Sequence, residues 1–253
     1  MQTVKLGSRG NDVKTLQQIL KITPADGIYG NGTFQKVKEF QKQYNLVQDG
    51  IVGPATWRIL VSLTNDMYIK AAYKIGCEVA ALKAVKIVET GGKAAFIATG
   101  KPSILFEGHV FWRELQARGI DPSKYAASNS TILYKTWTKK FYKSGLAEYT
   151  RLEQARRINV DAANASASWG MFQIMGNNYK MCGCKSVAEF VSRMCKSEEE
   201  QLMLTVDFIN ANKNIKNALI NKQWALFARY YNGAGYKQNA YDTKLQQAYN
   251  KLK

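Results

Sequence analysis

The sequence predicts a mainly α-helical protein of two domains, a small three-helix domain over residues 1–65 and a larger helical domain with a minor β element over residues 66–253. Apolar residues recur at helical spacing along most of the chain. A nine-residue motif occurs twice near the N-terminus. The chain of 253 residues with 46% hydrophobic content is long enough to bury a core in each domain.

The repeated motif marks the first domain. DGIYGNGTF starts at Asp26 and DGIVGPATW starts at Asp49, so Asp-Gly-Ile-x-Gly-x-x-Thr-aromatic recurs after 23 residues. Asp-Gly favours a turn, and the Thr of each copy is placed to cap a following helix. The copies therefore predict two equivalent loop-to-helix corners.

Three short helices account for the rest of this domain. NDVKTLQQIL, before the first copy, carries Val13, Leu16 and Leu20 on one face. The second helix starts at Phe34 and ends near Tyr44, and the third starts at Trp57. A polar passage over residues 62–66 then leads into the second domain.

Residues 67–90, MYIKAAYKIGCEVAALKAVKIVET, show helical spacing up to Gly91-Gly92, a natural helix stop. Glu89 is therefore expected in the last turn of a largely buried helix. The negative end of the helix dipole and the apolar neighbours are both expected to raise the pKa of Glu89. A carboxylic acid that stays protonated near neutral pH suits the general acid of glycosidic-bond cleavage, although a surface glutamate before a helix stop is equally common.

ILFEGHVFW places a second carboxyl group, Glu107, among apolar residues. A charge there is costly to bury, so we expect Glu107 to be paired or functional; the alternative is a strand residue that points to water. The uncharged run SASWGMFQIMGNNY, from Ser166 to Tyr179, resembles a sugar-binding wall of amides, hydroxyls and aromatic rings. Trp169, Met171 and Gln173 are its candidate contacts.

QWALFARYYNGAGY sets Trp224, Phe227, Ala228 and Tyr231 on one helical face that ends at Asn232-Gly233. Asn232, like Gln173, is suited to bind sugar amides or hydroxyls, and equally to satisfy backbone groups in the core.

Composition and charge restrict the function classes. The net charge of +17 favours polyanionic partners, but no nucleic-acid-binding motif accompanies it, so nucleic acid is not the expected partner. With His109 as the single histidine, zinc hydrolysis and Cys- or Ser-based peptidase chemistry are disfavoured. Cys182, Cys184 and Cys195 lack a usual zinc spacing, so no metal and no cofactor are expected.

The segments LGSRGNDVKTLQQIL, DGIYGNGTFQKVKEFQ and DGIVGPATWRIL resemble the peptidoglycan-binding type 1 domain. The resemblance implies that residues 1–65 bind the wall polymer in a shallow groove beside the Asp-Gly loops. The contacts that it implies are Asp26, Gly27, Tyr29, Asp49, Gly50 and Trp57. The glycines equally shape the turns, and Trp57 equally fits the core.

VETGG, SWGMFQIMG and YYNGAG occur in the order found in the lysozyme superfamily. Residues from about 75 to 250, ILFEGHVFW included, resemble the N-acetylmuramidase family of modular phage endolysins. The resemblance implies a lysozyme-like fold and cleavage of the bond between N-acetylmuramic acid and N-acetylglucosamine. It implies that Glu89 is the catalytic glutamate and Tyr231 the tyrosine that contacts it, with Glu107 as the candidate second acid.

The function predicted is that of a peptidoglycan hydrolase, an endolysin that lyses the bacterial host. The alternatives are a lytic transglycosylase acting on the same bond and a non-catalytic wall-binding phage protein. MQTVKLGSRG lacks the apolar core of a signal peptide, so the protein is expected in the host cytoplasm before release and in the periplasm at the cell wall afterwards. A monomer that depends on a holin for access, without stable membrane association, is expected.

Overall fold

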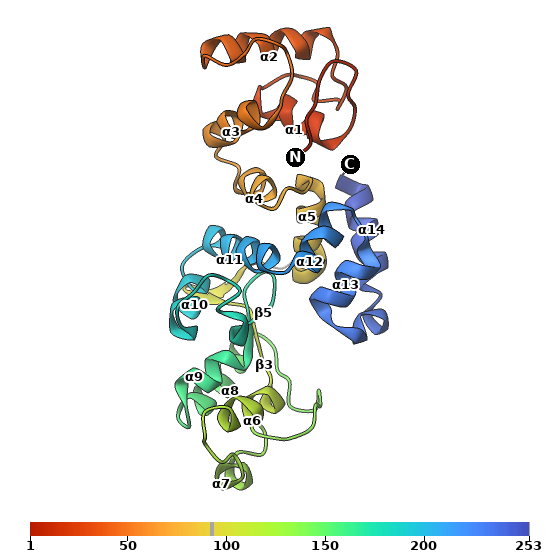
Figure 1. The fold of residues 1–253 in the computed structure, drawn as a ribbon. Helices are drawn as coiled ribbons and strands as arrows, with labels where there is room; N and C mark the ends of the chain where they lie inside the picture. Colours follow the sequence, from red (N-terminus) through yellow and green to blue (C-terminus); the bar gives the residue numbers. More distant parts are fainter. Residues whose placement is uncertain (92–93, 253) are drawn as a thin grey trace. The chain divides into compact units, whose positions relative to one another are not determined.

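The structure, a computed structural model, describes residues 1–91 and 94–252 and is built mostly of helices (Figure 1). The helices are α1 (Asn11–Ile19), α2 (Asn31–Gln43), α3 (Pro54–Leu63), α4 (Met67–Ile75), α5 (Val79–Thr90), α6 (Gly108–Gln116), α7 (Ser123–Ala126), α8 (Leu146–Arg156), α9 (Val160–Ala165), α10 (Val187–Met194), α11 (Glu198–Ala211), α12 (Lys213–Ile220), α13 (Trp224–Asn232) and α14 (Tyr241–Leu252). The strands are β1 (Phe96–Ala98), β2 (Lys101–Pro102), β3 (Ile104–Phe106), β4 (Ala167–Trp169) and β5 (Ile174–Met175). The predicted mainly α-helical fold with a minor β element is confirmed.

By its internal contacts the chain divides into two compact units. The first unit comprises Met1–Val88 and Lys213–Lys253, and the second comprises Glu89–Asn212. The first unit thus groups α1–α3 with later helices: the Asn11 side chain donates hydrogen bonds to Glu78 (2.7 Å) and to the Tyr249 hydroxyl (3.2 Å). The boundary between residues 65 and 66 stays a prediction.

In the small domain, α1–α3 surround a core that includes Val13, Leu16 and Leu60. The two Asp-Gly corners differ from the prediction in one respect. Thr33 and Thr56 lie inside α2 and α3 and do not cap them, because each helix begins one residue after the second glycine of its motif. Each Thr is buried instead beneath its loop.

Residues 67–90 form two helices and not the single helix that their periodicity indicates. Gly76 adopts a left-handed conformation with φ of 89°, which ends α4 before α5 begins at Val79. α12, α13 and α14 return to the start of α5 (Figure 1), where Lys222 Nζ lies 2.5 Å from Glu78 Oε1. The residues that close this unit therefore come from both ends of the chain.

The second unit contains the three-stranded antiparallel sheet β3-β4-β5 and the hairpin β1-β2. In the larger sheet, Ile104 pairs with Trp169 and Phe106 with Ala167. Phe106 and Trp169 are fully buried, while α6, α8 and α9 supply further core residues such as Leu152. The end of β3 leads directly into Glu107 and α6.

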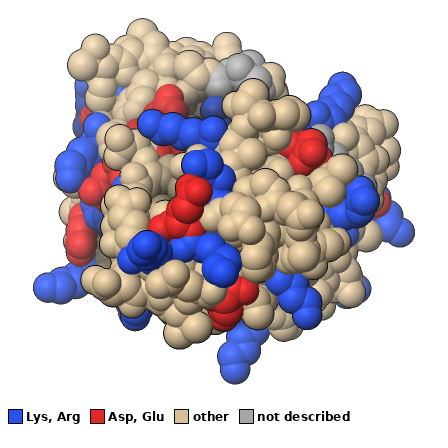
Figure 2. All heavy atoms as spheres, turned by 90° about the horizontal axis from the view of Figure 1, so that it is seen from above, with Lys and Arg blue, Asp and Glu red and all other residues tan. Residues whose placement is uncertain are grey.

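On the face drawn in Figure 2, Lys and Arg side chains are interleaved with a smaller number of Asp and Glu. None of the described helices has the length and apolar character needed to cross a bilayer.

Candidate active site

Glu89 occupies the expected place in the last turn of α5 and is half-buried. Ala84 and Val85, one turn earlier, are completely buried, so the helix approaches Glu89 through an apolar core. Gly91 follows the helix with φ of 56°, a left-handed conformation that ends it. Gly92, the second glycine of the expected helix stop, lies outside the described residues.

Glu107 is held at the junction of β3 and α6. Its backbone N–H donates to Ser166 O at 2.9 Å, which continues the pairing of β3 with β4. Glu107 then occupies the N-cap position of α6 without a capping hydrogen bond from its side chain. Gly108 is required next, because a Cβ there would lie 2.4 Å from the Tyr134 ring. The carboxyl group itself accepts a hydrogen bond from the Tyr142 hydroxyl.

Tyr142 is a site residue that the sequence reasoning missed. Burial and the hydrogen bond to the neighbouring Glu107 carboxyl group raise the pKa of Tyr142, so its hydroxyl stays protonated and remains a donor near neutral pH. The sequence signal available was segment 134–143, which is rich in aromatic and lysine residues. The spacing of these residues does not indicate which aromatic ring lies beside Glu107.

His109 lies beside the same carboxyl group. Its Nδ1 is 3.3 Å from Glu107 Oε2 but makes no hydrogen bond in the described structure, so the approach is not a well-aligned pair. Burial lowers the pKa of His109, and the opposing effect of Glu107 is smaller. The imidazole is therefore neutral near pH 7 and supplies no positive charge beside the Glu107 carboxyl group.

A buried ion pair on α8 supports the end of β3. Arg151 Nη1 lies 2.8 Å from Glu148 Oε2, and both side chains are almost completely buried. Glu148 accepts from the Phe106 N–H at 3.2 Å, and Arg151 donates to Phe106 O at 3.0 Å. The residue before Glu107 is thus fixed through both of its backbone groups.

The structure assigns packing roles to most of the predicted sugar wall. Trp169 is fully buried and donates to Asn164 O at 3.0 Å, and Met171 is buried beneath α11 with its N–H bonded to Gln201. The burial of both side chains argues against the predicted contacts with sugar. Gln173 donates to Gly170 O at 2.8 Å and accepts from Ser168 at 2.9 Å, so its amide serves the β4–β5 turn.

Tyr231 and Asn232 end α13, as expected from the Asn-Gly stop. Trp224, Phe227 and Ala228 are buried, and the Tyr231 ring stacks on Phe227 with centroids 5.2 Å apart. Tyr231 belongs to the first unit and Glu89 to the second. The contact between them stays a prediction.

In the small domain, one glutamine holds each Asp-Gly loop. Gln17 Nε2 donates to Asp26 at 2.8 Å, and its Oε1 accepts from the Gly27 N–H at 2.8 Å. Gln41 makes the same pair of hydrogen bonds in the second loop. It donates to Asp49 at 2.9 Å and accepts from the Gly50 N–H at 2.9 Å.

These hydrogen bonds direct both aspartates into their own loops. The bond from Gln17 and the Ile28 N–H hold the pKa of Asp26 below its usual range. In the second copy, the Ile51 N–H does so for Asp49, followed by Gln41. The carboxylates thus shape the loops, although both side chains remain exposed.

The other predicted wall contacts of this domain lie mostly in its core. Tyr29 and Trp57 are each 1% exposed; Tyr29 donates to Gly50 O at 2.8 Å and Trp57 to Gln2 O at 2.8 Å. Gly27 and Gly50 are also buried, and a Cβ at Gly50 would lie 2.1 Å from the Phe34 ring. Burial argues against a direct wall contact for these four residues.

A groove of about 370 Å³ lies beside the second Asp-Gly loop. Val47, 77% exposed, and Ile51 offer apolar surface there, with Asn45 and Asp49 as polar neighbours. The second Asp-Gly loop therefore borders a groove that is lined by exposed apolar and polar side chains.

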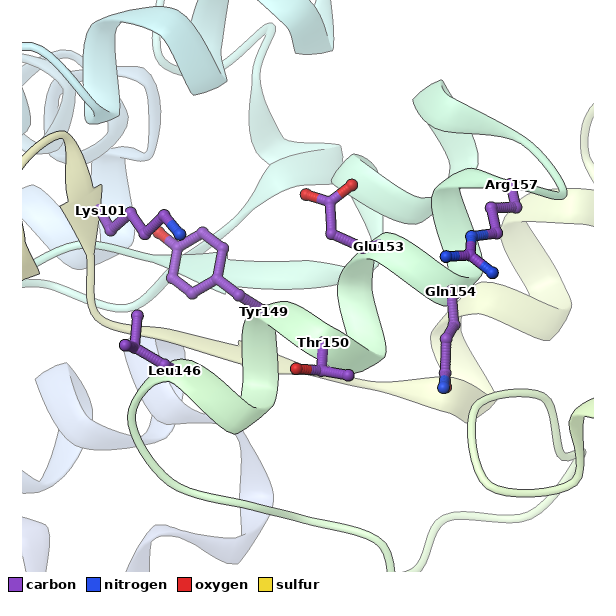
Figure 3. A pocket seen from close by; sticks show the side chains of 7 residues that line it. All are labelled: Lys101, Leu146, Tyr149, Thr150, Glu153, Gln154 and Arg157. Atoms are coloured by element: carbon purple, nitrogen blue, oxygen red, sulfur yellow. The ribbon is translucent and has the colours of Figure 1, made fainter.

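Another pocket, of about 400 Å³, lies on α8 in the second unit (Figure 3). Lys101 extends from β2 toward the Tyr149 ring, with Nζ 5.4 Å from its centroid, while Glu153 and Arg157 come from the far end of the pocket. Its lining carries both signs of charge.

The described residues give no support to a metal site. No three His, Cys, Asp or Glu side chains among them are grouped as metal ligands. Cys182 and Cys184 are buried, and burial raises the pKa of Cys182 to about 12, which keeps it a thiol.

The fold and site together define a modular protein, in which a repeat-built helical domain accompanies a helical domain where Glu89 lies at the end of α5 and Glu107 follows β3. The chain belongs to the N-acetylmuramidase family, whose model matches residues 78–253. A second model, of a putative peptidoglycan binding domain, matches residues 9–60. The predicted family, lysozyme-type enzyme class and two-module make-up are confirmed by these matches.

Known proteins resemble the chain to different extents. The crystal structure of a Burkholderia AP3 phage endolysin has a TM-score of 0.68 and 39% identity, with 99% of each chain covered. The spore cortex-lytic enzyme of Bacillus cereus is 35% identical over 69 residues, which are 25% of this chain and 27% of that enzyme. The N-acetylmuramoyl-L-alanine amidase CwlL of Bacillus licheniformis is 40% identical over 67 residues, 24% of this chain and 19% of that protein. The chain thus spans about a quarter, or less, of the length of the curated relatives that it matches.

Proposed function

We propose that this protein is a peptidoglycan hydrolase that cleaves the glycosidic bond between N-acetylmuramic acid and N-acetylglucosamine. The observation that carries the proposal is Glu89, a half-buried carboxyl group in the last turn of α5, within a chain of the N-acetylmuramidase family. Such a carboxyl group is suited to protonate the leaving oxygen as the bond breaks. Glu89 is the proposed general acid.

Glu107 is the proposed second acidic group. Its carboxylate is held by the Tyr142 hydroxyl and faces a neutral His109, so its negative charge is oriented without being cancelled. A fixed negative charge stabilises the positive charge that develops on the sugar ring during glycosidic cleavage. Tyr142 is then a positioning residue that acts through Glu107, and Tyr231 is the proposed contact of Glu89.

We further propose that the small domain holds the wall through the groove beside the second Asp-Gly loop. Val47 and Ile51 supply exposed apolar surface for sugar rings, and Asn45 and Asp49 supply polar groups. Buried Tyr29 helps to fix the adjoining loop, because its hydroxyl donates to Gly50 O. As a phage endolysin, the protein would act as a monomer and depend on a holin to reach the wall from the host cytoplasm.

Replacement of the proposed general acid tests the activity. Glu89→Gln is expected to reduce the release of reducing sugar from purified walls by about a thousandfold, since general acid catalysis contributes about 10²–10⁴. Glu199→Gln makes the same chemical change at an exposed position on α11 and is the control. Retention of activity in Glu89→Gln, with wall pull-down intact, would refute the role of Glu89.

Mass spectrometry of the products distinguishes the rival reactions. Hydrolysis adds one water to each cleaved bond, whereas a lytic transglycosylase leaves a 1,6-anhydro end and adds none. We expect reducing ends from the wild-type protein. Anhydro products would replace the proposal by transglycosylation, and binding without soluble fragments would replace it by a wall-binding role.

A further inference from the structure

A further cavity lies close to Glu107, between α8 and the irregular segment of residues 130–145. It has a volume of about 320 Å³, within the range of small-ligand sites. Its lining includes Lys140, Phe141, Lys143, Thr150, Arg151 and Gln154. Cations, one aromatic ring, a hydroxyl and an amide thus surround one space.

The charged side chains at the accessible surface of this cavity are all basic. Lys140 and Lys143 are exposed, and neither forms an ion pair in the described structure. Arg151 is buried and already neutralised by Glu148. No acidic residue lines the cavity, whereas the neighbouring pocket of Figure 3 has Glu153 in its wall.

The cavity is joined to the candidate active site by consecutive residues. Tyr142 turns inward and donates to Glu107, while its two neighbours, Phe141 and Lys143, line the cavity. Neighbouring Cα atoms are about 3.8 Å apart, so a ligand in the cavity lies next to the residue that orients Glu107. A group attached to a sugar bound at Glu107 would have a short path to it.

We propose that this cavity binds the peptide attached to the muramic acid of the substrate, through a carboxylate of that peptide. The inference rests on the proposed function. The two lysines are positioned for charge-assisted hydrogen bonds to the carboxylate, the Phe141 ring contacts an aliphatic side chain, and Thr150 and Gln154 meet peptide amides. The protein would then recognise the wall by its peptide as well as by its glycan.

The test compares one variant on two substrates. Lys140→Gln/Lys143→Gln is assayed on intact wall and on wall whose peptides have been removed by an amidase. Loss of the charge-assisted hydrogen bonds from both lysines predicts a fall of at least about tenfold in kcat/KM on intact wall. On stripped glycan the variant should equal the wild-type protein.

A charge-matched variant controls for non-specific attraction to the wall. Lys180→Gln/Lys185→Gln removes the same two charges from exposed positions outside the cavity and should act like wild type on both substrates. Equal losses on intact and stripped substrates, or no loss on either, would overturn the peptide site. A loss that appears only when anionic lipid vesicles are present would also overturn it, in favour of a lipid surface.

Direct binding provides a second measurement. A synthetic stem tetrapeptide with free carboxylates is titrated into the Glu89→Gln protein, followed by the same peptide with amidated carboxylates. Saturable binding of the first peptide alone, weakened by Lys140→Gln/Lys143→Gln, supports the site; equal binding of both peptides contradicts it. Failure of the wild-type protein to cleave either wall substrate refutes the proposed function instead and is a separate outcome.

Discussion

At the scale of single residues, the small domain depends on two buried glutamines. Gln17 and Gln41 each reach from the end of one helix into the following Asp-Gly loop, where they bind the aspartate side chain and the glycine N–H. Gln41 is 1% exposed, so its hydrogen bonds are shielded from water. Truncation of either side chain leaves the buried glycine N–H of its loop without that partner.

Gln41→Ala is therefore expected to lower the free energy of unfolding by about 1–3 kcal/mol, and Gln17→Ala by a similar amount, because an unpaired buried polar group is costly. Gln18→Ala changes the exposed neighbour on α1 and should cost less than about 0.5 kcal/mol. Urea unfolding monitored by circular dichroism measures all three. A cost for Gln41→Ala no greater than for Gln18→Ala would contradict the structural role.

His109 provides a prediction about pH. Burial places its pKa in the folded protein below the ordinary value of 6.5, so the unfolded chain binds the proton more readily. The contribution to stability is complete above pH 6.5 and is lost as the pH falls from there toward the folded pKa. His109 is the only histidine in the chain, which isolates its effect in this window.

The measurement is the midpoint of urea unfolding at pH 7.5 and at pH 5.5. The wild-type protein should lose stability between these values, and His109→Gln should lose less because it has no group to protonate. The same decline in both proteins would show that other groups cause it.

At the scale of secondary-structure elements, α8 connects the core to the surface of the second unit. Its inner face carries the Glu148–Arg151 pair, which binds both backbone groups of Phe106. Its outer face carries Thr150 and Gln154, which line the pockets on both sides of the helix. One element therefore fixes the strand before Glu107 and walls the proposed peptide site.

Glu148→Gln is expected to destabilise the protein by about 3–5 kcal/mol, because it leaves the charge of Arg151 buried without its partner. Glu153→Gln breaks an exposed pair with Arg156 on the same helix and should cost less than about 1 kcal/mol. Thermal unfolding compares the two. Equal effects would show that burial does not distinguish these ion pairs.

At the scale of the whole molecule, the net charge of +17 affects how the protein meets its substrate. On the face drawn in Figure 2, basic side chains are distributed and not collected in one patch. Such a charge attracts an acidic wall over a distance set by the ionic strength: the screening length is about 10 Å at 0.1 M salt and about 3 Å at 1 M.

Wall pull-down is accordingly expected to weaken as NaCl rises from 0.1 M to 1 M. Walls whose carboxylates have been amidated lack the charge and should show a smaller salt dependence. An identical salt response with both preparations would assign adhesion to uncharged contacts.

The sequence by itself determined the class of protein and the positions of several key residues. The Asp-Gly repeat identified the first module because turn chemistry is local, and helical periodicity with Gly91 placed Glu89 in the last turn of its helix. Periodicity also led to the wrong prediction of one continuous helix through Gly76. This single left-handed residue divides the expected helix into α4 and α5. The spacing of apolar residues does not reveal whether a glycine takes up the left-handed conformation that is open to it.

Tertiary structure decided which polar and aromatic residues are free to act. Trp169, Tyr29 and Trp57 have the composition of a sugar-binding surface, yet the fold buries them, since burial depends on neighbours that are distant in sequence. The partners of Glu107 could not be predicted for the same reason: Tyr142 is 35 residues away in sequence and meets Glu107 only in the folded protein. Turns and helix ends depend on neighbouring residues and can be recognised in the sequence, whereas contacts between distant residues form only in the folded protein.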